Sequence, residues 1–191
     1  MRITLLLPAT VLLLTACAPA PLSIESQNEN PLTASRYGDE LADTMAKFII
    51  NNDPILEDAS MRTLIEDEIE KGKDISERAQ KRQNKGLIGG IISMKASVLG
   101  YVLLIDKTLF LSSDFATSPG PSLHIYLSTV IDPRDADFPD DTAMDLGPLQ
   151  AAYGQQQYKV STGDPEKLRS FVLYDTRLKM IYGFAQISRT Y

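Results

Sequence analysis

The sequence predicts an α+β protein, in which a helical segment over residues 36–85 precedes an antiparallel β-sandwich or partly closed barrel over residues 86–191. In the first span, apolar residues recur at three- and four-residue intervals, the period of a helix with one buried face. In the second span, short apolar runs alternate with turn residues, which is typical of antiparallel strands. We therefore expect the principal hydrophobic core to form after Gly86.

The N-terminus predicts export and lipid attachment. Arg2 precedes an apolar stretch from Ile3 to Leu14, which is shorter than the ~20 residues that a membrane-spanning helix needs. The stretch ends in Leu14-Thr15-Ala16-Cys17, which resembles the lipobox of bacterial lipoproteins. Cleavage would then remove residues 1–16 and leave a lipid on Cys17. The alternative, a structural cysteine, lacks a partner because Cys17 is the only cysteine of the chain.

This resemblance implies a protein of the bacterial cell envelope, held at the membrane by acyl chains on Cys17. Ala18 in place of Asp favours the outer membrane, facing the periplasm, if the host is Gram-negative. Cleavage removes Arg2 alone among the charged residues, and leaves 18 basic against 25 acidic residues, a net charge of −7. Such acidity argues against nucleic acid as a partner, and it makes the lipid, not the protein surface, the membrane contact.

Residues 17–35 are rich in Pro, Ser, Asn and Gln, and predict a flexible tether. A first helix is expected from Asp39 to Asn51 and a second from Asp53-Pro54, with a possible restart at Ser60. A third, very polar segment from Ser76 to Asn84 should stop at Gly86 in the left-handed conformation. The apolar stripes of the first two helices are Leu41, Met45, Phe48 and Ile49, then Ile55, Leu56, Ala59, Leu64, Ile65 and Ile69.

Seven strands are expected in the second half of the chain. Residues 119–121 and 133–139 are rich in turn-forming residues and are expected to be loops. Asp106-Lys107 has the position of a tight hairpin turn. From Leu123 to Ser128 apolar and polar residues alternate, which predicts a half-buried strand with His124 on the solvent side. The seven expected strands are Ile88–Met94, Gly100–Ile105, Thr108–Ser112, Leu123–Ser128, Gln156–Val160, Ser170–Tyr174 and Lys179–Ile187.

Motifs in this second half also occur in a known family, in the same order and at similar spacing. They are Gly100-Tyr101-Val102, Leu109 to Phe115, Gly120-Pro121-Ser122-Leu123-His124-Ile125-Tyr126-Leu127-Ser128, Asp145-Leu146-Gly147-Pro148-Leu149, Gly154 with Gln156 or Gln157 and Tyr158, Phe171 to Asp175, and Tyr182-Gly183-Phe184-Ala185-Gln186-Ile187. Residues 86–187 thus resemble the DM-thirteen domain, a small extracytoplasmic module labelled as an electron-transfer domain. The resemblance implies an envelope protein that transfers electrons or binds a partner.

One departure limits the redox expectation. Where the family has a Trp-Cys pair, this chain has Tyr174-Asp175. A carboxylate forms neither a disulfide nor a sulfenic acid, so thiol chemistry is not available at Asp175. We expect Asp175 to be exposed at the end of its strand or paired with Arg177 or Lys179.

Metal and cofactor sites have little support. Haem, copper and iron–sulfur centres need several His, Met or Cys ligands, and His124 is the only histidine. The weak ligand candidates are Asp114, His124, Asp145 and Asp175, and His124 could pair with Asp114 or Asp145. Six aspartates between residues 132 and 145 offer oxygen ligands for calcium, but their spacing does not match an EF-hand. We interpret this loop as solvated and acidic.

Neither a nucleophile elbow nor a zinc-binding spacing is present, so no hydrolase is predicted. The sequence favours a non-enzymatic binding or interaction module without a cofactor, acting on an unknown envelope protein or small ligand. The alternative is a redox or electron-transfer accessory protein with an unidentified cofactor.

Overall fold

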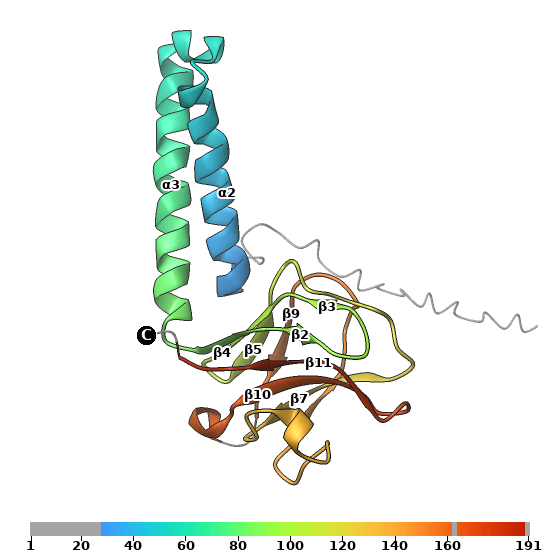
Figure 1. The fold of residues 1–191 in the computed structure, drawn as a ribbon. Coiled ribbons are helices and arrows are strands. Elements are labelled where there is room, and N and C mark those ends of the chain that lie inside the picture. Colours follow the sequence, from blue (N-terminus) through green and yellow to red (C-terminus); the bar gives the residue numbers. More distant parts are fainter. Residues whose placement is uncertain (1–27, 162–163, 190–191) are drawn as a thin grey trace, which may run out of the picture.

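The computed structural model describes residues 28–161 and 164–189, so the predicted signal sequence, Cys17 and the part of the predicted tether up to residue 27 lie outside the described residues. A hairpin of two long helices stands on a β domain (Figure 1). The predicted α+β class is confirmed, with a sandwich as its β part, because the described strands form separate sheets and no closed barrel. In this part of the chain no helix is both long and apolar enough to cross a membrane.

The hairpin consists of α2 (Pro31–Ile50) and α3 (Ala59–Gln83), joined by a short 3₁₀ turn, η1 (Pro54–Glu57). Helix α2 begins eight residues before the expected Asp39. Asn30 caps it by accepting a hydrogen bond from the Leu32 amide at 3.0 Å, and Pro31 fits the first turn. Residues 31–35, which the composition assigned to the tether, are therefore helical.

Helix α3 is continuous, so the expected separation of a polar third segment from Ser76 onwards was wrong. Asp58 caps its start by accepting from the Ser60 amide at 2.8 Å. Its end also differs from the expectation, because Gly86 does not have a positive φ. Gly86 instead allows a close approach, since a Cβ there would lie 2.7 Å from the Leu104 carbonyl oxygen.

Small residues bring the two helices of the hairpin together. A Cβ on Gly38 would lie 2.5 Å from the Gly72 carbonyl oxygen, and one on Gly72 would lie 2.7 Å from that of Gly38. Such distances leave no room for a side chain, so the two backbones are in direct contact. The other buried residues of the helices are also mostly small: Ala34, Ala42, Ser76 and Ala79.

The β domain consists of antiparallel strands in three sheets. The four-stranded sheet has the order β1 (Leu87–Gly90), β4 (Tyr101–Ile105), β5 (Thr108–Leu111) and β9 (Gln156–Lys159). The five-stranded sheet has the order β2 (Ile92–Ser93), β11 (Met180–Gln186), β10 (Ser170–Asp175), β7 (Leu123–Ser128) and β8 (Met144–Pro148). The third pairs β3 (Val98–Leu99) with β6 (Ala116–Thr117).

The main core lies between the two larger sheets and entirely after Gly86, as expected. Leu109 and Leu111 on β5 belong to the same buried cluster as Phe171 and Leu173 on β10. The sheets also meet at one corner, where Ile88 and Ser188 exchange backbone hydrogen bonds of 2.8 and 3.1 Å. This corner joins the first strand of the domain to its last segment.

Most expected strands are present, with two differences. The run Ile88–Met94 is divided between β1 and β2, which belong to different sheets, and the Ile91 amide between them donates to the Gly100 carbonyl. The short strands β3, β6 and β8 were not predicted from the pattern. The Asp106-Lys107 turn is confirmed: both residues have positive φ, 49° and 57°, and Ile105 pairs with Thr108.

Strand β7 is not half-buried as its alternation predicted. Tyr126 and Ser128, on the expected solvent face, are also buried, like Ile125 and Leu127 on the other face. The loop between β7 and β8 covers this second face, because Phe138 and Ala143 pack on a cluster of Tyr126, Val172, Tyr174 and Phe184.

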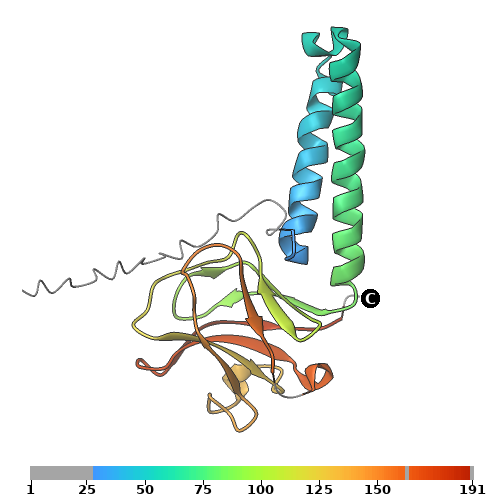
Figure 2. The same ribbon diagram turned by 180° about the vertical axis from the view of Figure 1, so that it is seen from behind.

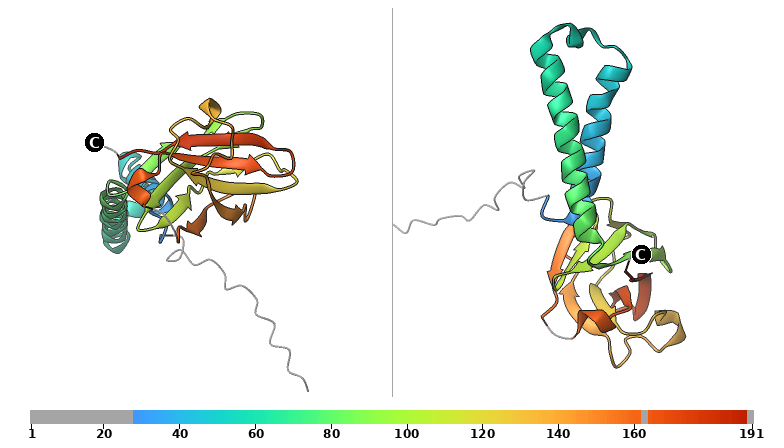
Figure 3. Two further views of the ribbon diagram at one scale, coloured as in Figure 1. Left: turned by 90° about the horizontal axis from the view of Figure 1, so that it is seen from below. Right: turned by 90° about the vertical axis from the view of Figure 1, so that its left-hand side faces the viewer.

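Only the lower end of the hairpin meets the β domain (Figure 2). The Asn30 side-chain amide donates to the Leu111 carbonyl at 2.7 Å, and Leu32 packs on Leu103, Ile105 and Phe110. These three residues form the outer face of the four-stranded sheet. The rest of the hairpin projects away from the domain (Figure 3).

Candidate functional site

A groove of about 430 Å³ lies between two loops at the edge of the five-stranded sheet. One loop leads into β7 and the other follows β8, and the Leu149 amide donates to the Leu123 carbonyl at 2.8 Å to hold them side by side. The groove is lined by residues 119–124 and 148–152. His124 is the only titratable side chain among these lining residues.

Asp175 lies behind the first of these loops and is completely buried. Its carboxylate accepts hydrogen bonds from three backbone amides, those of Ser122 (3.2 Å), Arg177 (3.0 Å) and Leu178 (2.9 Å). Burial disfavours the charged form, but the amide donors outweigh this effect and lower the pKa of Asp175 below its usual value. Asp175 is therefore a buried, ionised carboxylate.

The expectation that Asp175 is exposed, or paired with a basic side chain, was wrong. Arg177 contributes its backbone amide and a favourable electrostatic effect, and none of the hydrogen bonds to Asp175 comes from Lys179 among the described contacts. The strand pairing contributes to the burial, because Asp175 is the last residue of the middle strand and pairs with Leu123 of β7 on one side and Met180 of β11 on the other. A residue expected at a free strand end is enclosed by the loop before β7.

Gly120 makes this enclosure possible. A Cβ at this position would lie 2.6 Å from the Asp175 carboxylate and 2.7 Å from the Tyr182 hydroxyl. Further along the loop, the Ser122 hydroxyl lies 2.7 Å from that of Thr176, and the Thr176 amide donates to the Ser122 carbonyl at 2.9 Å. The wall of the groove is thus fastened to the turn that follows β10.

His124 and Asp145 form a pair at one end of the groove. His124 Nδ1 lies 2.9 Å from an Asp145 carboxylate oxygen, with 25% and 41% of the two side chains exposed. Asp145 also accepts from the Gly147 amide at 2.7 Å. Burial, together with the charge of Asp145, raises the pKa of Tyr126 to about 12. Tyr126, Asp145 and His124 therefore form an electrostatically coupled chain, in which a hydrogen bond joins His124 to Asp145.

The four ligand candidates do not gather at one point. His124 and Asp145 are in contact. Asp175 pairs across the sheet with Leu123, the residue before His124, and lies behind the groove wall. Asp114 is exposed elsewhere, after β5, and interacts electrostatically with Arg36 of α2. Of the two partners considered for His124, the structure selects Asp145.

The described residues do not fit a redox metal centre. Over residues 28–161 and 164–189, no group of three or more His, Cys, Asp or Glu side chains is placed to hold a metal ion. The aspartates of the 132–141 loop are not a free calcium site either. Asp132 binds Arg134, and Asp140 accepts from the Ser128 hydroxyl (2.8 Å) and the Thr142 amide (2.8 Å). This loop is organised by its own hydrogen bonds, and its Asp135, Asp137 and Asp141 are exposed, as predicted for a solvated acidic loop.

An aromatic cluster beside the site was missed by the sequence analysis. Tyr126, Phe138 and Tyr174 contact each other edge to face, with ring centroids 5.3–5.9 Å apart. Arg134 lies over the Phe184 ring at 5.1 Å. The available signal was the single Phe138 within an acidic loop, since an aromatic residue among aspartates needs an apolar surface to cover.

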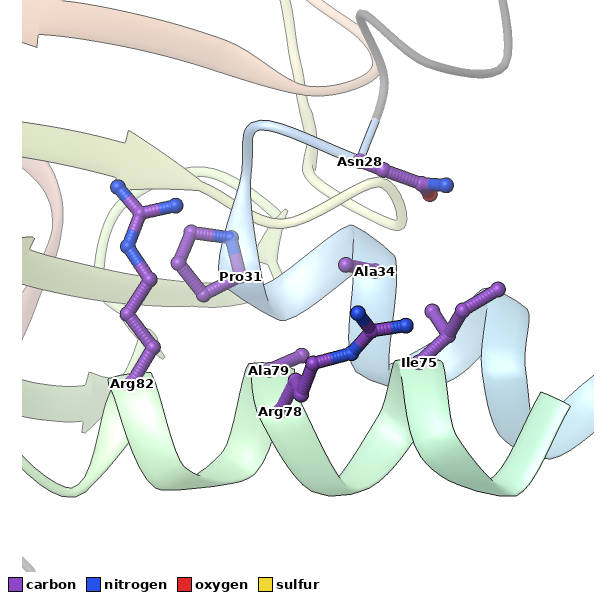
Figure 4. Close-up of a pocket in the computed structure, with 7 residues that line it drawn as sticks. All are labelled: Asn28, Pro31, Ala34, Ile75, Arg78, Ala79 and Arg82. Carbon is purple, nitrogen blue, oxygen red and sulfur yellow. The ribbon is translucent and has the colours of Figure 1, made fainter. Parts of the chain in front are cut away.

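A second pocket, of about 280 Å³, lies at the base of the hairpin between α2 and α3 (Figure 4). Arg78 and Arg82 line it, together with Pro31 and Ile75. Both arginines have partners: Arg78 forms an ion pair with Asp74 at 2.6 Å, and Arg82 donates to the Glu29 carbonyl at 3.0 Å. This pocket therefore offers less unused binding chemistry than the groove beside His124.

Comparison with known families gives one match, over residues 91–187, to the family described as Electron transfer DM13. The matched region begins between β1 and β2 and ends just after β11, so it contains the groove, Asp175 and the His124–Asp145 pair. Neither the curated proteins nor the solved structures gave a significant match to the chain.

Proposed function

Because this chain belongs to the DM13 family, we propose that its β domain is a non-enzymatic binding module, held at the bacterial cell envelope by a lipid on Cys17. The observation that carries the proposal is the burial of Asp175, which stands where relatives are expected to have a redox cysteine. In this chain Asp175 binds the loop that forms one wall of a groove. Its role is therefore to maintain the shape of a binding surface, and not thiol chemistry.

The chemistry of Asp175 supports this role. A carboxylate that accepts three backbone amides and is completely buried is satisfied by the fold and is not exposed to solvent. Its lowered pKa keeps it ionised at neutral pH, and the hydrogen bond from the Ser122 amide to this charge restrains the loop from Gly120 to Ser122. Pre-organisation of this kind reduces the entropy lost when a ligand binds.

The lining of the groove indicates the kind of ligand. Pro119, Pro121, Pro148 and Leu149 provide rigid apolar surface, and the polar lining residues are Ser122, His124 and Gln150, of which His124 can donate or accept a hydrogen bond. Ligand sites combine apolar surface with polar groups that fix the orientation of the ligand. A small ligand, or a short segment of an envelope protein, fits this description.

Electrochemistry and spectroscopy on the chain lacking residues 1–17 test the proposal. We expect no visible absorbance band, no bound metal by elemental analysis and no reversible electron uptake in the range of envelope redox carriers. In parallel, NMR screening of small-molecule fragments should shift signals of His124 and Ser122. Ile131→Ser, a change at an exposed residue outside the groove, should leave these shifts unchanged. Reversible electron transfer by the purified chain would refute the binding-module proposal.

The lipid anchor is tested separately. Cys17→Ser removes the thiol that takes the lipid, so the precursor should remain uncleaved and should not incorporate a fatty-acid analogue. Ala18→Asp is the matched change beside it, and it should leave cleavage and labelling intact. If the Cys17→Ser chain were still labelled and cut at the same bond, the lipoprotein assignment would be wrong.

A second candidate function is electron transfer, and the Tyr126–Asp145–His124 chain favours it. A phenol that loses one electron to an external one-electron oxidant releases its proton, and the carboxylate whose charge acts on the Tyr126 hydroxyl, Asp145, is the acceptor that we propose. Oxidation of the chain with such an oxidant should then give a tyrosyl radical signal that Tyr126→Phe abolishes. The matched variant Tyr153→Phe, at an exposed tyrosine, should keep it.

A further inference from the structure

The end of the hairpin far from the β domain exposes an unusual amount of apolar surface. We call residues 46–70 the hairpin tip. Five of the twelve large apolar side chains that are strongly exposed in the described residues lie in it. Ile50 is 79% exposed and Leu64 is 52% exposed. The other three are Ile49, Ile55 and Met61.

The packing of the helices explains why this surface is open. Near the middle of the hairpin, Gly38 and Gly72 bring the backbones into contact. Towards the tip the helices diverge, as the right-hand view of Figure 3 shows. A groove of about 650 Å³ lies between them there, lined by Ala46, Ile49, Ile50, Glu66, Ile69, Glu70 and Lys73. The apolar residues of the tip therefore have space between the helices but little to fill it.

The tip is also strongly acidic. It contains seven acidic residues against two basic ones, a net charge of −5. The next fifteen residues, 71–85, contain six basic residues against two acidic ones, a net charge of +4. Charge is thus distributed unevenly along helix α3, with the negative charge towards the tip. The helix has 25 residues and is about 37 Å long. The negative end coincides with the exposed apolar surface.

We propose that the hairpin tip is a docking site for another protein, which presents an apolar surface surrounded by Lys and Arg side chains. Clustered exposed apolar residues are typical of interaction sites, and the acidic surroundings select a basic partner. The same charge disfavours an anionic membrane and a second copy of the tip, since like charges would face each other. The site is independent of the groove beside His124, which lies in the β domain.

The hairpin has the form that such a role needs. The tip projects away from the β domain (Figure 3), so a partner can reach it while the domain engages something else. Ile50 and Leu64 contribute little to folding, because half or more of each side chain stays in water. Their apolar character therefore needs another reason, and contact with a partner supplies one.

The chain lacking residues 1–17 can be tested with synthetic probes. The first probe is an amphipathic helical peptide of Leu and Lys, and the second is the same peptide with Glu in place of Lys. Fluorescence anisotropy should show binding of the Lys peptide alone, with an affinity that falls as salt is added. The double variant Ile50→Ser with Leu64→Ser should weaken this binding at least tenfold. The matched control, Leu99→Ser with Tyr153→Ser, removes equally exposed apolar residues of the β domain and should bind as the original chain does.

Charge reversal distinguishes binding at the hairpin tip from attraction to the overall negative charge of the protein. Glu66→Lys with Glu70→Lys should also weaken binding at least tenfold, whereas Asp137→Lys with Asp141→Lys, the same change of charge on an exposed loop of the β domain, should not. Far-UV circular dichroism checks that all variants keep their helices. Equal effects of both charge reversals, or no effect of the serine variants, would overturn the proposal.

Two further measurements address the other possible occupants. The chain should not co-sediment with phosphatidylglycerol vesicles. Sedimentation equilibrium should show no dimer formed through the tip; such a dimer would be recognised because Ile50→Ser with Leu64→Ser abolishes it. Vesicle binding through the tip would assign it to the membrane, and a dimer through the tip would assign it to a second copy. Either result would overturn the proposal of a basic protein partner.

Discussion

In the β-sandwich, Phe115, Phe171 and Phe184 are at most 1% exposed, whereas the buried apolar residues of the two long helices are Ala34, Ala42, Ile65 and Ala79. Large side chains from facing sheets fill the sandwich. The hairpin is held by small residues that let two backbones touch, and by contacts of its lower end with the outer face of the four-stranded sheet.

The difference shows how one chain can combine a stable body with a projecting arm. Burial of apolar area is the main driving force of folding, and the sandwich contains most of it. The hairpin buries little large apolar surface, so its stability depends on tight packing of the backbones and on attachment to the β domain. Its exposed tip is consistent with a part of the molecule that is built for contact and not for a core.

Separating the hairpin from the sandwich should have the largest effect on folding. We expect residues 86–191 alone to remain folded, although loss of Leu32 uncovers Leu103, Ile105 and Phe110. Residues 28–85 alone should lose most of their helix, because short helices without tertiary packing are marginal in water. Circular dichroism and the dispersion of amide NMR signals measure both. An insoluble sandwich, together with a well-folded hairpin, would reverse the comparison.

A large-to-small change in the sandwich should have the next largest effect. Phe171→Ala removes a fully buried ring from the main core and should lower the free energy of unfolding by about 3–5 kcal/mol. In the hairpin, Phe48→Ala is the matched change, and it should cost less because Phe48 is only partly buried. Denaturant unfolding measures both. Equal losses would mean that the hairpin has a core comparable to that of the sandwich.

The buried carboxylate links the sandwich to the groove. Asp175→Asn weakens three hydrogen bonds to a charged acceptor and should lower the free energy of unfolding by about 1.5–3 kcal/mol at pH 7. The pKa of Asp175 is lowered in the folded protein, so its stabilisation is complete above the pKa of the unfolded chain, about 4. It should be lost as the pH falls from about 4 through the lower folded value. The difference between wild type and Asp175→Asn should therefore shrink below about pH 4. A difference that stays constant from pH 7 to pH 2 would contradict the ionised state.

The smallest effect is expected from a methyl group added in the hairpin. Gly72→Ala places a Cβ 2.7 Å from the Gly38 carbonyl oxygen, so the helices must separate, which should cost about 1–2 kcal/mol. Thr44→Ala, on the exposed face of α2, is the control and should be neutral or slightly stabilising. Thermal unfolding followed at 222 nm measures both. A more stable Gly72→Ala variant would show that the helix contact is looser than described.

Local patterns in the sequence were sufficient for the fold class and for most strands. Helical period, strand alternation and turn residues depend on neighbours a few positions apart, which is why the bounds of β7 and the Asp106-Lys107 turn were predicted correctly, although the burial of the second face of β7 was not. The start of α2 was missed because a polar, proline-containing segment has the composition of a tether. Its cap, Asn30, is buried by a contact with Leu111, 81 positions away in the sequence.

The candidate site depended more on long-range contacts. The sequence alone named Asp145 and Asp114 as possible partners of His124, and only the pairing of β7 with β8 selected Asp145. It identified Asp175 as the departure from the family pattern, but the tertiary structure decided that this carboxylate is buried. The physical reason is that Gly120 and Ser122 are more than fifty residues away along the chain. The amides of Arg177 and Leu178 are local donors. The desolvation of Asp175 and its hydrogen bond from the Ser122 amide exist only after the sheet has formed, so no local pattern encodes the burial of this carboxylate.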